Sequence, residues 1–162
     1  MAAWKRICCP VDFSAVSAEA VEEAAELAWR FGGMVTLLHV REPPPVPPTE
    51  TVSSPEAAEK AVTVDQERQL ESWRERAERV ATTSVESALV TGDAATEIIR
   101  FAGEGRHDVI VMGTHGRTGR EKVAFGSVAQ KVILDAPCPV LVIHARGARS
   151  RGADVKGSRF TE

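Results

Sequence analysis

The stretch 113–127, which reads G-x2-G-x9-G-S, constrains the fold of this chain more than any other part of its sequence. The apolar run just before it, 109–112, predicts a buried strand, and the apolar spacing of 127–134 predicts a helix. The glycines therefore lie between the end of a strand and the start of a helix. In an open α/β sheet, that is where ligands bind.

The residue types in this stretch favour an anion as the ligand. A helix N-terminus offers unpaired backbone N–H groups and a partial positive charge, and both attract phosphate. Glycine lets the backbone approach such an anion closely and adopt a positive φ. The Ser127 hydroxyl can donate to a phosphate, or its Oγ can cap the helix, and the sequence leaves both roles open.

The N-terminal part of the chain predicts a strand, a helix and a second strand. Residues 4–11 form the first strand, Ser14 is a suitable N-cap for the following helix, and Gly32 with Gly33 ends that helix. The second strand covers 34–40. A strand–helix–strand unit of this kind predicts parallel pairing with a right-handed crossover.

The remaining segments continue this alternation of strands and helices. Residues 56–81 contain no Pro or Gly and predict a long helix, with a break near Thr63 and Val64 as the alternative. A weaker strand at 84–90 and a short helix capped by Asp93 follow, before the elements around the glycine stretch and a last strand. This order predicts a single-domain, open, five-stranded parallel sheet with helices on both faces.

Length and composition set the domain plan. The chain has 162 residues, which suits one domain, here 1–145. The loop 41–55 is rich in proline and predicts a tolerated surface insertion, with a lid or a partner ligand as the alternative. The Gly-, Ser- and Arg-rich end, 146–162, predicts a disordered tail.

Charge and residue counts exclude several classes of protein. The net charge of −3 argues against nucleic-acid binding. No apolar run approaches the ~18 residues of a membrane span, so we expect a cytoplasmic protein with no membrane partner. The three cysteines predict buried small hydrophobes and no disulfide framework, and the four histidines show no spacing typical of metal ligands.

Three further segments accompany the glycine spacing: the strand ends at 7–12 and 37–40, and the last strand at 136–143. Together they resemble the universal stress protein family, in the branch that binds ATP, over roughly residues 3–145. The resemblance implies a strand order of 3-2-1-4-5, in which winding reverses between the first and fourth strands. Asp12 and Gly113 are then expected to flank one crevice.

The resemblance also implies a set of residues that bind an adenine nucleotide. Adenine is expected against Val11 and Val40, while Asp12 accepts hydrogen bonds from the adenosine part or, alternatively, caps the first helix. The complete set that the resemblance assigns to the ligand is Pro10, Val11, Asp12, Val40, Met112, Gly113, Gly116, Arg117, Gly126, Ser127 and Val128.

Positive charge in the glycine stretch fits a polyphosphate. Arg117, Arg120 and Lys122 can neutralise phosphate charge, or they are solvated loop residues. The segment 119–125 departs from the family, where this stretch is commonly more apolar. The more polar segment affects how tightly the loop is expected to pack on the helix and on the ligand, but it does not change the positions of the glycines.

The expected cofactor is ATP, bound with Mg²⁺, and the expected function is a nucleotide-dependent regulatory module in a stress response. The alternatives are a slow ATPase or phosphotransfer enzyme, and a nucleotide-free dimeric scaffold. Phosphoryl transfer needs a placed base and usually a metal, and His115 is the only nearby candidate base, so we assign no catalytic or metal-ligating residue. The resemblance also implies a homodimer joined through the apolar edge strand, 138–144.

Overall fold

A computed structural model of the protein describes residues 4–43, 55–114 and 125–144. In chain order the elements are β1 (Arg6–Pro10), α1 (Ala15–Phe31), β2 (Met34–Arg41), α2 (Pro55–Ala81), β3 (Ser84–Thr91), α3 (Ala94–Glu104), β4 (Val109–Gly113), α4 (Ser127–Asp135) and β5 (Val140–Ile143). The strands form one sheet in the order β3-β2-β1-β4-β5, and all four pairings are parallel. The predicted fold class and strand order are confirmed.

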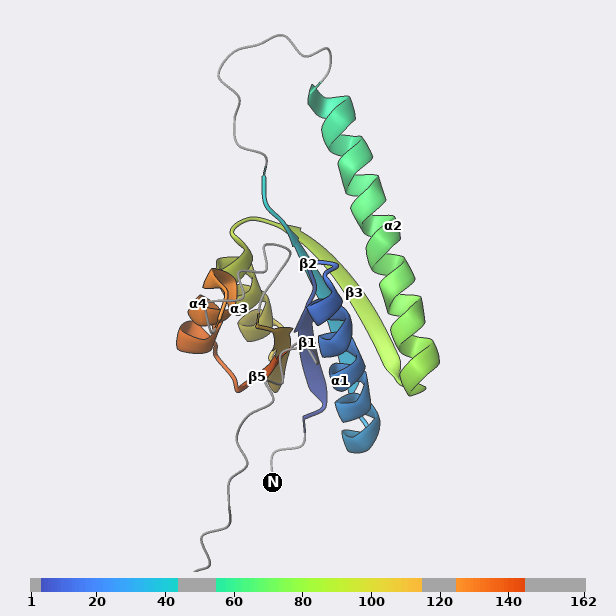
Figure 1. Ribbon diagram of the computed structural model, residues 1–162, viewed down its shortest axis with the longest axis vertical. Helices are drawn as coiled ribbons and strands as arrows, with labels where there is room; N and C mark the ends of the chain where they lie inside the picture. Colours follow the sequence, from blue (N-terminus) through green and yellow to red (C-terminus); the bar gives the residue numbers. More distant parts are fainter. Residues whose placement is uncertain (1–3, 44–54, 115–124, 145–162) are drawn as a thin grey trace, which may run out of the picture.

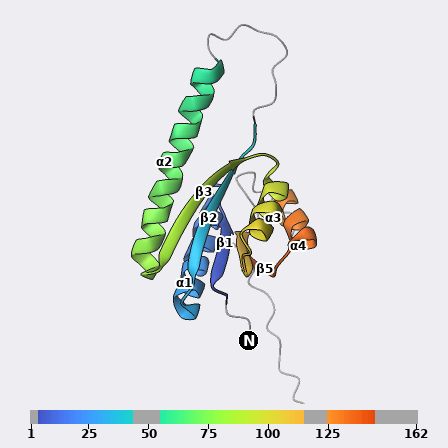
Figure 2. The ribbon, with the colours of Figure 1, turned by 180° about the vertical axis from the view of Figure 1, so that it is seen from behind.

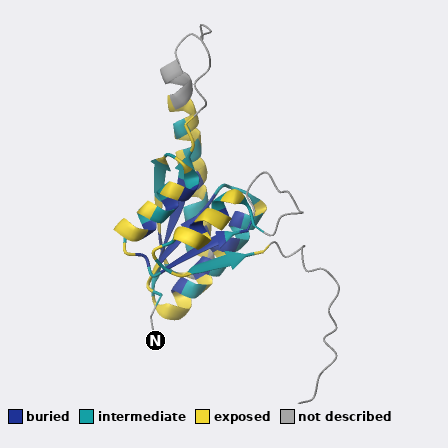
Figure 3. Ribbon diagram, turned by 90° about the vertical axis from the view of Figure 1, so that its left-hand side faces the viewer, coloured by how far each residue is buried: buried dark blue, intermediate teal, exposed yellow. Residues whose placement is uncertain are grey.

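The sheet lies between two helical layers. Helices α1 and α2 cover one face, and α3 and α4 cover the other (Figures 1 and 2). Because both faces are covered, the central strand β1 is apolar without alternation, and its residues Ile7, Cys8 and Cys9 have no exposed surface. Burial is therefore greatest in the three inner strands β2, β1 and β4, while the outward faces of the helices are exposed (Figure 3).

Two helices begin at the N-caps that the sequence predicts. Ser14 accepts a hydrogen bond from the Ser17 N–H at the start of α1, and Asp93 accepts one from the Thr96 N–H at the start of α3. Gly32 ends α1 in the left-handed conformation, at φ 61°, which glycine adopts without steric cost. The Ser14 cap fixes where α1 begins after the end of β1.

Helix α2 runs for 27 residues without interruption, so the alternative of a break near Thr63 and Val64 is wrong. At 1.5 Å per residue it is about 40 Å long, and its N-terminal half extends past the sheet (Figure 1). Leu70 and Ala77 are buried against the core. In the projecting half, Thr63 Oγ1 accepts a hydrogen bond of 2.7 Å from Arg41 Nη1 at the end of β2. This bond ties the helix to β2 at the position of the alternative break.

Three predicted segments lie outside the described residues: most of the proline-rich loop, the glycine-stretch residues 115–124, and the tail. Within the described part of the chain, no helix is both long and apolar enough to cross a membrane. The cysteines are free thiols; Cys8 and Cys9 are buried as predicted, whereas Cys138 is only partly buried.

Candidate functional site

The candidate site lies at the edge of the sheet where β1 and β4 end. These neighbouring strands pair in parallel, and the chain leaves β1 for α1 on one face and β4 for α4 on the other. This is the reversal of winding at which open α/β sheets bind ligands. The strands place Pro10 and Gly113 at their ends and Asp12 two residues beyond β1.

Asp12 belongs to a compact network of hydrogen bonds with two serines. Its Oδ1 accepts from Ser17 Oγ at 2.6 Å and from the Ser14 N–H at 3.1 Å. The Asp12 N–H donates to Ser17 Oγ at 3.2 Å. Because Ser14 is the N-cap of α1, the alternative that Asp12 is a plain helix cap is wrong. The carboxylate is instead held beside the start of the helix.

Phe13, the residue after Asp12, adopts a left-handed conformation with φ 64°. For a residue with a side chain such a conformation costs about 1–3 kcal/mol, and it persists where the surroundings hold it. The centroid of the Phe13 ring lies 4.4 Å from that of the His39 imidazole and 5.5 Å from that of Trp73 in α2, which it meets edge-on. His39 is buried, and its Nδ1 lies 2.8 Å from the carbonyl oxygen of Val11. These contacts fix the turn that presents Asp12.

Gly113, the last residue of β4, has a packing reason to lack a side chain. A Cβ at this position would lie 2.6 Å from Val16 Cγ1 in the first turn of α1. The glycine therefore lets α1 pack closely on β4, whether or not a ligand is bound. Met112, beside it, is 6% exposed and packs into the cluster beneath α3 and α4.

Helix α4 begins with a glycine where α1 and α3 begin with capping side chains. Gly126 is the N-cap, with φ −68° and ψ 160°, and Ser127 is the exposed first residue of the helix. The alternative that Ser127 is the N-cap is therefore wrong. The φ is also negative, so the conformation of Gly126 does not require glycine. The start of α4 is tied to the end of β4, because the Gly126 N–H donates to the Thr114 carbonyl at 2.7 Å.

The structure brings together only some of the other predicted residues. Val11 is 4% exposed and lies in the cluster beneath α1 and α2, whereas Val40 and Val128 pack against the cluster on the opposite face. A ring that contacts both Val11 and Val40 would have to lie across the strand ends. Gly116 and Arg117, with His115, Arg120 and Lys122, lie outside the described residues.

Sequence reasoning did not single out four residues that shape this edge of the sheet: Phe13, Ser17, His39 as a packing residue, and Thr114. The buried Thr114 donates its N–H to the Ile143 carbonyl of β5 and accepts from Gly126, so it joins β4, β5 and α4. Ser17 could have been found from the sequence, because it stands three residues after the predicted N-cap. No pattern in the sequence reports the others.

The pKa values of Asp93 and of the two β1 cysteines are shifted by their surroundings. The Thr96 hydroxyl and N–H, followed by Lys131, lower the pKa of the Asp93 carboxyl to about 2, and Lys131 Nζ lies 3.2 Å from Asp93 Oδ2. Burial raises the pKa of the Cys8 thiol to about 12, and it also raises that of Cys9. Both thiols are therefore protonated. The described residues hold no cluster of three side chains suited to a metal ion.

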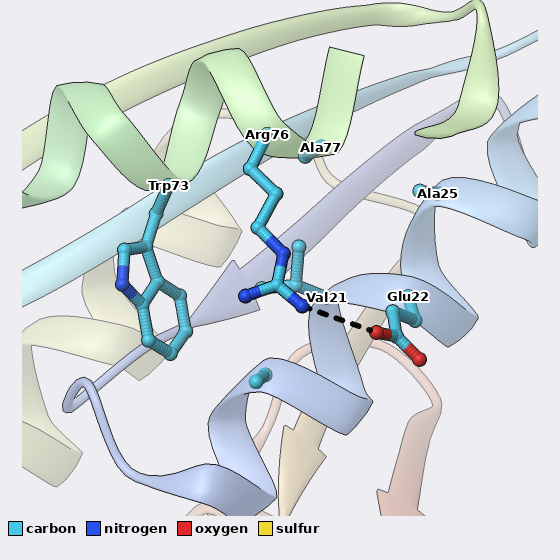
Figure 4. Close-up of a pocket in the computed structure, with 7 residues that line it drawn as sticks. Val21, Glu22, Ala25, Trp73, Arg76 and Ala77 are labelled. Carbon is cyan, nitrogen blue, oxygen red and sulfur yellow. Dashed lines mark ion pairs between the residues drawn. The ribbon is translucent and has the colours of Figure 1, made fainter. Parts of the chain in front are cut away.

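A small hollow lies elsewhere, between α1 and α2 (Figure 4). Its volume of about 20 Å³ accommodates roughly one water molecule. It is lined mainly by apolar side chains, and Arg76 pairs with Glu22 across it at 3.8 Å. The hollow does not include the strand ends, so it is separate from the candidate site.

Comparisons with known proteins agree with this geometry. A sequence model of the universal stress protein family matches residues 3–144. A universal stress protein of Methanocaldococcus jannaschii is 34% identical over 140 residues, which cover 86% of this chain and 82% of that protein.

Solved structures share the fold. The universal stress protein UspA from Lactobacillus plantarum is 27% identical, with a TM-score of 0.74 over 88% of this chain and 99% of that chain. The universal stress protein from Archaeoglobus fulgidus, solved in complex with dAMP, is 25% identical, with a TM-score of 0.60 over 88% of this chain and 99% of that chain. By its sequence and its fold, the chain belongs to the universal stress protein family.

Proposed function

We propose that this universal stress protein binds ATP at the carboxyl edge of β1 and β4 and acts as a nucleotide-dependent regulatory module. The observation that carries the proposal is the start of α4. Gly126 has no side chain to cap the helix, and it is held beside the end of β4 at the reversal of winding. A helix N-terminus at that position favours a phosphate.

The two ends of the ligand would meet different parts of the site. Phosphates would lie against the N–H groups of Ser127 and Val128, with Gly126 allowing close approach and the exposed Ser127 hydroxyl as a further donor. The adenosine end would lie toward Asp12, where the carboxylate accepts hydrogen bonds. A family member solved with dAMP supports an adenine nucleotide as the class of ligand. Mg²⁺ would enter with ATP, held largely by phosphates and water.

We propose regulation over dedicated catalysis because Asp12 would lie at the adenosine end, away from the terminal phosphate. Hydrolysis would then be slow, well below the ~10 s⁻¹ typical of enzymes. A slow ATPase is the second candidate, and a nucleotide-free scaffold is the third. The glycine pattern of 113–127 favours a nucleotide-binding member over the scaffold.

We also propose a homodimer joined through the strand at 138–144. β5 is an edge strand, and its four residues, Val140–Ile143, are apolar and only partly buried. Such an edge can pair with a second chain. Val142→Lys should give a monomer in analytical ultracentrifugation, while Val62→Lys, on the exposed part of α2, should leave the dimer intact. A dimer that survives Val142→Lys would place the interface elsewhere.

Calorimetry with ATP, AMP, cyclic AMP and adenosine tests the nucleotide proposal. ATP should bind more tightly than adenosine, and Ser127→Ala should weaken ATP binding at least about tenfold, because a hydrogen bond to a charged group contributes about 1.5–3 kcal/mol. Gly126→Ala should abolish measurable binding, although its φ of −68° accepts alanine without strain.

A matched glycine substitution controls for general effects on the fold. Gly103→Ala lies in α3, where a Cβ would make an ordinary contact of 3.6 Å with Pro137. It should leave ATP affinity unchanged. Equal affinity for ATP and adenosine, or intact binding in Gly126→Ala, would refute a phosphate site at α4. Turnover of about 1 s⁻¹ or faster would move the protein to the enzyme class.

A further inference from the structure

The hydroxyl of Ser17 stands out among the buried polar groups near the site. Ser17 is 6% exposed and lies in the first turn of α1, beneath the Asp12 turn. We propose that Ser17 is a positioning residue, which fixes the Asp12 carboxylate for the nucleoside end of the ligand. This inference rests on the proposed function and adds the residue that sets the geometry of its adenosine end.

The contacts of Ser17 use its full hydrogen-bonding capacity. A serine hydroxyl has one donor and two acceptor positions. Here the donor goes to Asp12 Oδ1 at 2.6 Å, and the acceptors take the Asp12 N–H at 3.2 Å and Ser14 Oγ at 3.3 Å. Ser17 thus holds both the backbone and the carboxylate of Asp12, which leaves little freedom to the angle between them.

The backbone and the side chain of Ser17 have separate roles. Its N–H donates to Ser14 Oγ at 3.2 Å, which is the cap of α1. Its hydroxyl reaches back to Asp12 instead. Losing the Ser14 side chain therefore removes the helix cap, whereas losing the Ser17 hydroxyl removes its two bonds to Asp12 and keeps the Ser17 N–H that the cap uses. Two serines three residues apart give a matched pair of variants.

Preorganisation is the physical reason for such a contact. A carboxylate that must be fixed when the ligand arrives loses rotational freedom at that moment, and this loss weakens binding. A carboxylate already locked by buried neighbours avoids that loss. Phe13 and His39 hold the other side of the same turn through their ring contact. The Ser17 hydroxyl is the side chain of this support that donates to the carboxylate, at 2.6 Å, beside the backbone N–H of Ser14 at 3.1 Å.

Competition calorimetry up to millimolar ligand tests the inference on the full chain, with adenosine and ATP as probes. Ser17→Ala should weaken both ligands by the same factor, about tenfold, because Asp12 would serve their shared nucleoside. Ser17→Thr, which keeps a hydroxyl, should restore most of the affinity. Ser14→Ala should lower the melting temperature of the unliganded protein and change both affinities less than Ser17→Ala does.

A double-mutant cycle separates positioning from general stability. If Ser17 acts through Asp12, Ser17→Ala should change affinity less than about twofold in an Asp12→Asn background. Equal losses in both backgrounds would overturn the inference, as would unchanged affinity in Ser17→Ala or a loss confined to ATP. A wild-type protein that binds neither ligand would refute the proposed function and this inference with it. If the wild type binds both ligands, the affinities of the Ser17 variants test this inference separately from the proposed function.

Discussion

Replacing Gly113 with alanine should destabilise the unliganded protein. The added Cβ would lie 2.6 Å from Val16 Cγ1 and 3.3 Å from Val16 Cβ. Carbon atoms in contact normally lie about 3.5–4.0 Å apart, so the first turn of α1 or the end of β4 must move by about 1 Å. Overpacking of this kind costs about 1–3 kcal/mol. For a domain of this size we expect the melting temperature to fall by about 3–8 °C.

A compensating substitution shows whether this contact is the cause. Val16→Ala removes Cγ1 and alone should cost about 1 kcal/mol, because the side chain is only partly buried. In Gly113→Ala/Val16→Ala the 2.6 Å clash with Cγ1 is absent and only the 3.3 Å contact with the Cβ of residue 16 remains, so the loss should be at least about 1 kcal/mol smaller than the sum of the single losses. Urea denaturation followed by circular dichroism measures all four proteins.

Two outcomes would contradict the packing role of Gly113. If Gly113 serves only the ligand, Gly113→Ala should leave the unliganded stability unchanged and reduce ATP affinity alone. Additive losses within about 0.5 kcal/mol would also contradict the packing argument, since independent sites behave in that way. Either outcome would return Gly113 to the purely ligand-binding role that the sequence pattern suggested.

Three further predictions concern the rest of the fold. Leu70→Ala, at 3% exposure, should cost about 3 kcal/mol in urea unfolding, whereas Leu134→Ala, at 75% exposure, should change stability by less than about 0.5 kcal/mol. Asp93 has a folded-state pKa lowered to about 2, so its contribution is present above its unfolded pKa of about 3.9 and is lost as pH falls toward 2. Asp93→Asn should therefore make the melting temperature depend less on pH over that range, and an unchanged pH dependence would contradict the assignment. A thiol reagent should label Cys138 in the folded protein but reach the buried Cys8 only on unfolding; equal rates read by mass spectrometry would contradict the burial.

The architecture followed from the sequence because its signals are local and repeated. Apolar runs of strand length alternate with helical spacing, and polar caps at Ser14 and Asp93 mark where two helices begin. The order of the strands came from the family resemblance, because pairing between distant segments leaves no local trace. Helix α4 begins at Ser127 as predicted, and only the alternative of Ser127 as its N-cap was wrong, since a glycine N-cap such as Gly126 is a weaker signal than a serine.

The interior of the site was less accessible to sequence reasoning. The pattern assigned Gly113 to a ligand, yet its contact with Val16 depends on how α1 crosses β4. The ring contact of Phe13 with Trp73 joins residues 60 positions apart, and no periodicity reports it. Single-residue rules also predicted Asp12 as a possible cap, whereas the structure gives that role to Ser14 and holds Asp12 through Ser17.

Mapping of backbone amide shifts by ¹⁵N NMR during an ATP titration tests the central claim most directly. We predict that the largest shift changes fall at the carboxyl edge, on the amides of Asp12 and Ser127. These changes should saturate with ATP, and the affinity fitted to them should equal the affinity from calorimetry. The amides of Met34 and Val109, at the opposite edge of the sheet, should stay in place. Shifts centred on the α1–α2 hollow near Ala77, or no saturable shifts at millimolar ATP, would contradict the account.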